Sequence, residues 1–217
     1  MTDQNNVSAA EALERLRAGN ARFAGGVRSV ATLSSQLDRE QHAAGQRPFA
    51  VILTCSDSRV PAELVFDQGI GDLFVIRVAG NVIAPSLVGS VEFAAAKFGT
   101  QLVVVLGHSS CGAVTATLDV IRGRAEVATS NLGDIVDRIR PAVATLVEVG
   151  AGEDEAGLLE AAVRANVRSS VAHLRHASRL LEDMVQKGTV VVVGAEYDLV
   201  SGRVDFFDAP ADLAAAE

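Results

Sequence analysis

The sequence contains little cysteine and no tryptophan, and it has fewer basic than acidic residues. Cys55 and Cys111 are the two cysteines among 217 residues, whereas a small secreted domain stabilised by disulfides would carry several pairs. The 19 basic and 27 acidic side chains give a formal net charge of -8, which opposes nonspecific binding to nucleic acid or to an anionic membrane surface. We therefore expect no nucleic-acid partner and no membrane partner, and we expect the two thiols to have a chemical task.

Long hydrophobic runs and targeting segments are also absent from the sequence. No apolar stretch approaches the roughly 20 residues that span a bilayer, and the N-terminus has no basic segment followed by an apolar one. With 49% hydrophobic and 21% charged residues, the chain is typical of a single globular domain with a sizeable core and not of a disordered chain. These observations predict a cytoplasmic protein with one domain over residues 1–217.

Apolar runs alternate with helical patterns along the chain. Strands are predicted by the runs at 49–55, 73–78, 102–106 and 190–193. Helices are predicted at 8–24, 33–44, 86–98, 113–121, 132–149 and 157–186. Strands that are apolar at every position are typical of a parallel sheet covered on both faces, so this order predicts an α/β fold with a mainly parallel central sheet flanked by helices. A Ser201-Gly202 turn in the segment after Tyr197 predicts an additional edge strand.

Two short polar segments begin where apolar strands are predicted to end. They are CSDSR at 55–59 and GHSSCG at 107–112. In an open parallel sheet, ligands bind outside the carboxyl ends of the strands, at the point where the strand order reverses. If the first and third strands are neighbours there, both segments converge on one site with the side chains of Cys55, Asp57, His108 and Cys111. Two thiols, one imidazole and one carboxylate favour zinc over magnesium or calcium.

Three interpretations of these side chains are possible. The cysteines could be ordinary buried thiols, or the four groups could form a closed structural zinc site. Arg59 favours a catalytic site, because a guanidinium pairs bidentately with a carboxylate and so offers Asp57 a partner other than the metal. When Asp57 pairs with Arg59, water can take the fourth coordination position.

Together, the motifs CSDSR and HSSCG resemble those of the β-class carbonic anhydrases. The similarity extends to Gln46 and Pro48 before the first strand, to FVIRVAGN at 74–81 and to GAEYDLVSGRV at 194–204, and it covers roughly residues 8–208. It implies reversible hydration of carbon dioxide to bicarbonate and a proton by a zinc-bound hydroxide, with one zinc ion per subunit. It also implies an obligate homodimer or a dimer of dimers, with an N-terminal helical arm at about 8–45 that extends to the dimer partner and a zinc-binding core at about 46–208.

The resemblance assigns roles to the metal-binding residues. It makes Cys55, His108 and Cys111 permanent zinc ligands. It makes Asp57 an exchangeable ligand, which binds zinc in a closed state and pairs with Arg59 in an open state. Two thiolates donate more charge than imidazoles would, so the zinc-bound water should be less acidic than in an all-histidine site, and good activity should need mildly alkaline conditions.

The resemblance also assigns residues to the substrate site. Gln46 is implied to donate a hydrogen bond to a substrate oxygen, typically across the dimer interface. The backbone N–H of Gly112 is implied to lie near the bicarbonate. Phe74, Ala79 and Phe93 fall where the family builds its apolar substrate pocket, and plain core packing is the alternative for them.

Two other functions are considered for this site. Hydrolysis of carbon disulfide or carbonyl sulfide occurs on the same fold, where access to the zinc selects the substrate. A noncatalytic scaffold stabilised by zinc would need Asp57 to be bound permanently. The presence of Arg59 and of Gln46 argues against the scaffold.

One position departs from a subgroup of the family. Members that hold inhibitory bicarbonate in a second pocket carry a tryptophan three residues before the first zinc cysteine, and here that residue is Ile52. Arg77 and Tyr197 match the two other positions of that pocket. The incomplete set predicts weak inhibition by bicarbonate.

Overall fold

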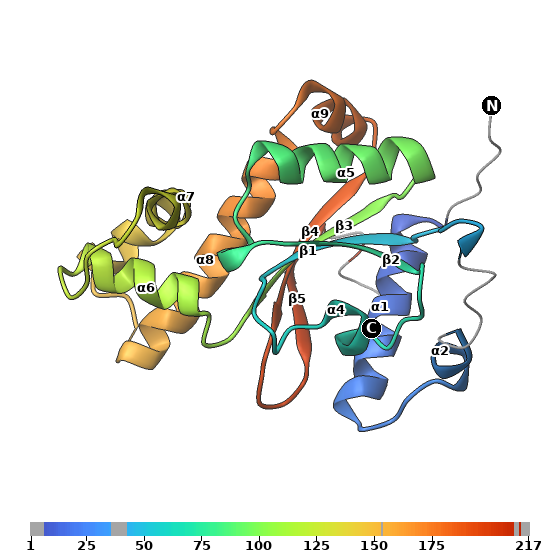
Figure 1. Ribbon diagram of the computed structural model, residues 1–217, viewed down its shortest axis with the longest axis horizontal. Coiled ribbons are helices and arrows are strands. Elements are labelled where there is room, and N and C mark those ends of the chain that lie inside the picture. The colour runs from blue at the N-terminus through green and yellow to red at the C-terminus, as the bar shows by residue number, and fades with distance from the viewer. Residues whose placement is uncertain (1–6, 36–42, 153, 211–212, 214–217) are drawn as a thin grey trace.

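The strand order of the central sheet creates the edge at which polar segments can meet. The computed structural model describes residues 7–35, 43–152, 154–210 and 213 (Figure 1). Within these ranges one sheet has the order β2-β1-β3-β4-β5; its strands are β1 Ala50–Thr54, β2 Leu73–Arg77, β3 Leu102–His108, β4 Val191–Tyr197 and β5 Val204–Asp208. The first four strands run parallel, and β5 pairs with β4 in the antiparallel direction. The strand order therefore reverses between β1 and β3, and the predicted mainly parallel sheet and its added edge strand are confirmed.

Helices cover both faces of this sheet (Figure 1). Their bounds are α1 Ala9–Ala24, α2 Val30–Ser35, α4 Ala62–Val65, α5 Pro85–Phe98, α6 Gly112–Ile121, α7 Ser130–Glu148, α8 Glu155–Arg175 and α9 Arg179–Gln186, with a 3-10 turn, η1, at Ala79–Asn81. Alternate residues of β1 point to opposite sides: Ile52 packs in the cluster with α1 and α4, and Leu53 packs in the cluster with α5 and α8. A third apolar cluster joins α6, α7 and α8 beside the end of β1. Every residue of β1 is buried, which explains why its sequence is apolar throughout.

One predicted helix differs from the structure, and two short elements were not predicted. The single helix predicted at 157–186 is wrong, because the chain forms α8 and α9 with a break at 176–178, where the Ser178 side chain accepts a hydrogen bond from the Leu181 N–H at 3.2 Å. Such a serine cap satisfies a backbone donor that a continuous helix would pair internally. The sequence patterns also missed the short elements α4 and η1. Of the helix predicted at 33–44, residues 36–42 lie outside the described part of the chain.

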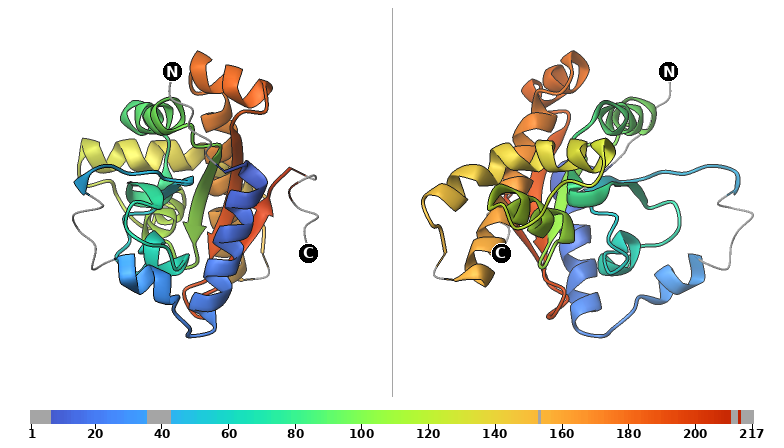
Figure 2. Two further views of the ribbon diagram at one scale, coloured as in Figure 1. Left: turned by 90° about the vertical axis from the view of Figure 1, so that its right-hand side faces the viewer. Right: turned by 60° about the vertical axis from the view of Figure 1, so that its left-hand side comes forward.

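Asn20 attaches α1 to two distant segments of the chain. Its side chain is buried, and its Nδ2 donates to the carbonyl oxygens of Val65 at 3.1 Å and Gly202 at 2.9 Å. Its Oδ1 accepts a hydrogen bond from the Val204 N–H at 2.8 Å. One asparagine thus pairs three backbone groups, and it holds α1 beside the β4–β5 hairpin, as Figure 2 shows.

A buried carboxylate attaches the segment between α1 and α2. The Asp67 side chain is fully buried and accepts hydrogen bonds from Arg22 Nε at 2.5 Å and from the Ser29 N–H at 3.0 Å. Burial raises the pKa of Asp67, but these hydrogen bonds outweigh it, so the pKa lies below its usual range. The charge of Asp67 therefore holds the end of α1 and the segment that follows it in place.

In the described residues, no helix combines the length and the apolar character that a membrane span requires. The division of the chain into an arm at about 8–45 and a core at about 46–208 stays a prediction.

Replacing Asn20 by Ala should lower the free energy of unfolding by about 2 to 4 kcal/mol, because three buried backbone groups lose their partner. Urea denaturation followed by circular dichroism measures this change. The matched control is Asn131→Ala, which alters an exposed asparagine of α7 and should change the stability by less than about 0.5 kcal/mol. Equal losses in the two variants would contradict the attachment role of Asn20.

Candidate metal centre

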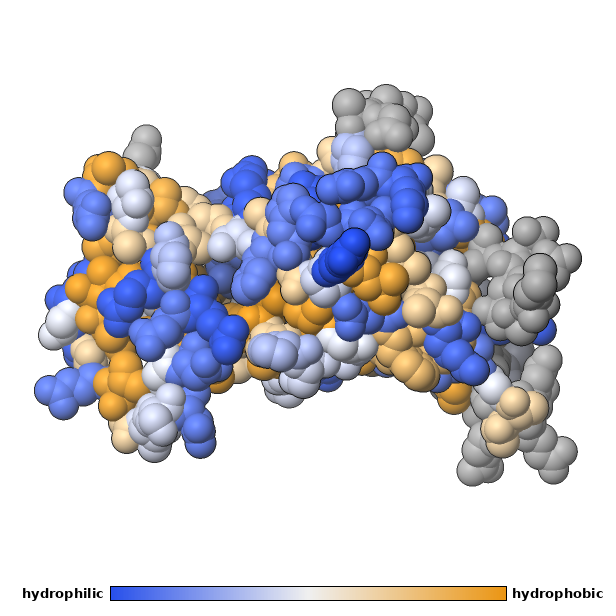
Figure 3. Space-filling view, turned by 90° about the horizontal axis from the view of Figure 1, so that it is seen from above, coloured by the Kyte–Doolittle hydropathy of each residue, from blue (hydrophilic) through white to orange (hydrophobic). Residues whose placement is uncertain are grey.

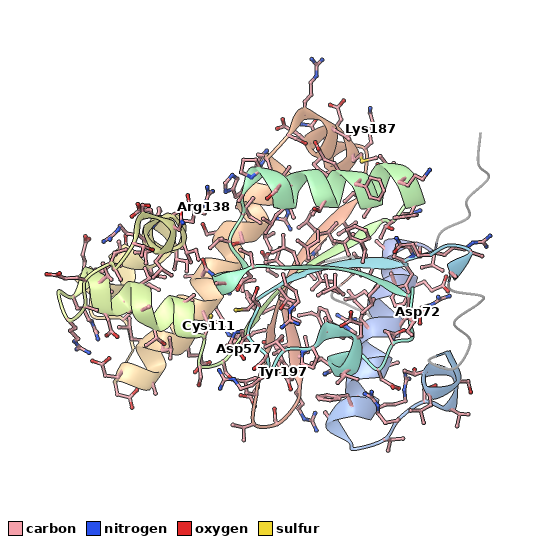
Figure 4. The ribbon with its side chains drawn as sticks, in the orientation of Figure 1. Asp57, Asp72, Cys111, Arg138, Lys187 and Tyr197 are labelled. Atoms are coloured by element: carbon pink, nitrogen blue, oxygen red, sulfur yellow. The ribbon has the colours of Figure 1, made fainter. Side chains whose placement is uncertain are left out.

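The two polar segments predicted to carry the chemistry meet at one edge of the sheet. Strands β1 and β3 pair directly, with Thr54 opposite Leu106, so the chain leaves both strands at the same level. Cys55 follows β1, His108 ends β3, and Cys111 is the N-cap residue of α6. The ligand atoms of these three residues all lie within 4.8 Å of one another. Figure 4 shows Cys111 and Asp57 close together at this edge.

The chemistry of the three side chains fits a zinc ion. His108 is completely buried, and its Nδ1 lies 2.9 Å from the Ser109 carbonyl oxygen, to which we assign the Nδ1–H as donor. Its Nε2 has no hydrogen-bond partner among the described residues. A buried polar atom is costly to leave without a partner, and a neutral imidazole nitrogen beside two sulfurs is a ligand set that zinc prefers.

The surroundings of the two thiols shift their pKa values in opposite directions. A hydrogen bond from Cys111 holds the pKa of Cys55 well below its usual range, against the opposing effect of burial, and the neighbouring His108 adds to the shift. The same bond to Cys55, together with burial, raises the pKa of Cys111. A thiolate is the form of cysteine that binds metals, so Cys55 is prepared as a ligand by its neighbours.

Asp57 is held by Arg59 at the border of this group. Arg59 Nε donates to Asp57 Oδ1 at 2.9 Å, Nη2 donates to Oδ2 at 2.7 Å, and the Arg59 backbone N–H donates to Oδ1 at 2.9 Å. The side-chain hydrogen bond from Arg59 holds the pKa of Asp57 well below its usual range. Asp57 Oδ2 lies 3.9 Å from His108 Nε2. The carboxylate is thus next to the converging ligand atoms while its hydrogen bonds go to the guanidinium.

Arg77 supports the CSDSR segment, a role that the sequence analysis missed. Its Nε donates to the Cys55 carbonyl oxygen at 3.2 Å, and its Nη2 donates to the Asp57 carbonyl oxygen at 2.6 Å. Arg77 is the last residue of β2 and lies directly opposite Thr54 of β1. A basic residue at the end of an apolar strand was the feature of the sequence that could have indicated this role. Tyr197, the residue matched with Arg77 to a bicarbonate pocket, is buried, and its ring lies 6.3 Å from that of Phe23.

Two of the predicted substrate residues line one cavity beside the metal centre. Ala79 and Gly112 border an apolar cavity of about 360 Å³, which α6, the segment 125–128 and α7 enclose. Val127 and Leu132 on its rim are 39% and 52% exposed, and hydrophobic surface is visible at the α6–α7 end of the molecule (Figure 3).

Phe74 and Phe93 lie elsewhere. Together with Phe98 they form a cluster of aromatic rings between β2 and α5, with ring centroids 5.6 to 6.2 Å apart. Phe93 is 52% exposed. Neither ring lines the cavity that Ala79 and Gly112 share.

Gln46 lies at the opposite end of the sheet from the metal centre of its own chain. It precedes β1 and borders a cavity of about 560 Å³ together with Ile70 and Asp72, whereas Cys55 follows β1. At about 3.3 Å per residue, the strand alone separates the two ends by roughly 16 Å. Figure 4 shows Asp72 at the far end of the sheet from Asp57 and Cys111. Gln46 therefore cannot reach the three ligand atoms of its own chain.

A parallel sheet with a Cys-His-Cys group at its switch point defines a class of α/β metalloproteins, and comparison with known proteins narrows this class. The family model "Carbonic anhydrase" matches residues 50–204. A carbonic anhydrase of Mycolicibacterium smegmatis is 40% identical over 206 residues, which are 94% of this chain and 95% of that protein. Carbonic anhydrase 2 of Mycobacterium tuberculosis is 38% identical over 198 residues, covering 91% of this chain and 92% of that protein.

Solved structures agree with this result. The β-carbonic anhydrase CafA of Aspergillus fumigatus has a TM-score of 0.71 at 26% identity, covering 90% of this chain and 91% of that chain. A tetrameric β-carbonic anhydrase of Sordaria macrospora shares the fold, with a TM-score of 0.72 at 21% identity over 91% of this chain and 97% of that chain. The chain belongs to the β-class carbonic anhydrase family.

Purified protein should contain one zinc ion per chain, and Cys55→Ser should remove it, because the substitution deletes a ligand from a three-residue set. Elemental analysis after gel filtration measures the content. Ser56→Ala, which alters the exposed neighbouring side chain, should keep the metal. A Cys55→Ser protein with full zinc content would refute the assignment of the metal centre.

Proposed function

We propose that the chain catalyses the reversible hydration of carbon dioxide to bicarbonate and a proton, with zinc held by Cys55, His108 and Cys111. The observation that carries this proposal is the position of Asp57, which lies beside the three ligand atoms but pairs bidentately with Arg59. Three protein ligands with a nearby carboxylate are typical of a catalytic site, which keeps a coordination position for water or substrate. Zinc, when bound, lowers the pKa of a coordinated water and so supplies a nucleophile near neutral pH.

The residues of the chain then have distinct tasks. Cys55, His108 and Cys111 hold the metal in a buried setting. Asp57, kept ionised and in place by Arg59, accepts a hydrogen bond from the attacking solvent oxygen and orients its lone pair toward carbon dioxide. A noncatalytic scaffold would instead need Asp57 on the metal, so the hydrogen bonds between Asp57 and Arg59 argue against that alternative.

The substrate side of the site is supported by the cavity next to α6. Carbon dioxide is small and apolar, and Ala79 offers it an apolar wall. Bicarbonate is an anion, and Gly112 is the first residue of a ten-residue helix, whose N-terminus favours negative charge. We assign Phe74 and Phe93 to this substrate site only through a partner subunit, since their cluster lies away from the cavity of their own chain.

The place of Gln46 supports a homodimer or a dimer of dimers. Because Gln46 lies beyond the far end of β1, its contact with substrate requires the site of a second copy, to which the N-terminal arm would extend. We also propose a cytoplasmic location, which the composition favours.

Arg59→Ala should lower the carbon dioxide hydration rate at pH 7 by roughly tenfold or more, with little change in zinc content. The reason is that Asp57 loses its partner and moves onto the metal. More hydroxide is available as the pH rises, so solvent competes better with Asp57 for the metal. The loss of hydration rate should therefore be smaller toward pH 9. Stopped-flow measurements with a pH indicator give these rates.

The matched control for this experiment is Arg124→Ala. Arg124 is similarly exposed and pairs with Glu155 at 2.8 Å, so its loss should leave the hydration rate unchanged. An Arg59→Ala protein that keeps its zinc and hydrates carbon dioxide at the wild-type rate from pH 7 to 9 would refute the role of Arg59 in keeping Asp57 off the metal. If the wild-type protein shows no hydration at all, the proposed function itself fails.

A mixed dimer tests whether Gln46 acts across an interface. Gln46→Ala and Cys55→Ser should each be weakly active alone, but co-expressed they should recover up to about half of the wild-type rate per mixed dimer. In that dimer the metal-free chain supplies its intact Gln46 to the site that keeps zinc. Purification with two different affinity tags isolates the mixed species. No recovery, or wild-type activity in a monomer, would show that Gln46 does not act in a partner's site.

A further inference from the structure

The Cys55 sulfur receives a hydrogen bond from the backbone of a neighbouring turn. The Gly80 N–H lies 3.3 Å from Cys55 Sγ, and Cys55 is buried. A hydrogen bond to a thiolate draws negative charge away from the sulfur, so the sulfur donates less charge to a metal. This bond therefore opposes the electron-rich character that two thiolates give to the site.

The turn that provides this N–H has an unusual backbone. Gly80 and Asn81 have φ angles of 69° and 44°, both in the left-handed region. Glycine adopts this region freely, but asparagine does so less readily. A side chain on Gly80 would also come within 2.8 Å of the Ile139 side chain. The direction of the Gly80 N–H thus depends on a conformation that the surrounding structure has to hold.

Two polar side chains of α8 hold this turn. Asn166 Nδ2 donates to the Gly80 carbonyl oxygen at 2.8 Å, and Ser170 Oγ donates to the Asn81 carbonyl oxygen at 3.1 Å. They are four residues apart, on one face of the helix, and are 2% and 5% exposed. The other buried residues of α8 are Leu158, Ala162, Val163, Val167, Val171 and Leu174.

Burying an amide and a hydroxyl among aliphatic side chains is unfavourable unless both find partners. Here both partners belong to the same turn, and this turn contacts the Cys55 sulfur. The polar pair therefore does more than join α8 to the sheet, since aliphatic residues at the same positions would provide that packing.

We propose that Asn166, assisted by Ser170, is a positioning residue for the metal centre, because it fixes the turn 79–81 so that the Gly80 N–H bonds the Cys55 sulfur. Asn166 touches neither the metal ligands nor the substrate cavity in this assignment, and it acts through Gly80. The inference rests on the proposed function only in requiring that Cys55 bind a metal.

Cobalt-loaded protein provides a test that does not depend on catalysis. In Asn166→Leu, which has a similar size but no donor, the thiolate-to-cobalt charge-transfer band should move to lower energy, because the sulfur is more electron-rich without its hydrogen bond. Zinc affinity, measured by competition with a chelator, should fall by about 10- to 100-fold, because the loss of the fixed position of Cys55 outweighs the greater charge on its sulfur. The control is Arg175→Met, which removes another hydrogen bond from α8 to a backbone carbonyl, that of Val192 at 2.7 Å, and should leave the band in place.

A second variant covers the case in which Asn166→Leu does not fold. Ser170→Ala removes one hydroxyl, keeps the packing, and should shift the band in the same direction by a smaller amount. An unshifted band in the folded variants, with stability lost as in Arg175→Met, would show that Asn166 only supports the fold. If the wild-type chain binds neither cobalt nor zinc, the metal centre and this inference fail together, whereas bound cobalt with unshifted bands overturns this inference alone.

Discussion

The direct parallel pairing of β1 with β3 is the constraint on which the metal centre depends. Cys55 and His108 belong to segments 53 positions apart in the sequence, and the pairing of Thr54 with Leu106 brings the ends of both strands to one level. A shift of one residue in this register would turn the side chains of one strand to the other face. The buried apolar residues on both faces of β1 oppose such a shift, so the packing of the core also fixes the geometry of the ligands.

Around the ligands, arginine side chains hold the CSDSR segment in place. Arg77 fixes the carbonyl groups of Cys55 and Asp57, and Arg59 fixes the carboxylate of Asp57. Arg77 belongs to β2, and Arg59 lies in the segment that follows β1. These hydrogen bonds hold the groups around the ligand atoms in fixed positions, which reduces the reorganisation that the reaction requires.

The sequence was sufficient to predict the parallel sheet, the major helices and the convergence of CSDSR with HSSCG, because apolar runs and polar strand ends are local signals. It was not sufficient to predict the break at Ser178, since the helical pattern continues on both sides and only the cap marks the boundary. The contacts of Arg77 and Asn166 depend on tertiary neighbours, which no local pattern records. Gln46 was assigned through a resemblance, and its distance from Cys55 became evident only with the strand between them in place.

The attachment of α1 through Asn20 also has a consequence for biosynthesis. Asn20 bonds to Gly202, which is 182 positions later in the chain. At about 5–20 residues per second, a ribosome needs roughly 10 to 40 s to make that intervening length. The three hydrogen bonds of Asn20 are therefore completed only after the β4–β5 hairpin has been synthesised. The attachment of α1 thus joins segments that are synthesised at widely separated times.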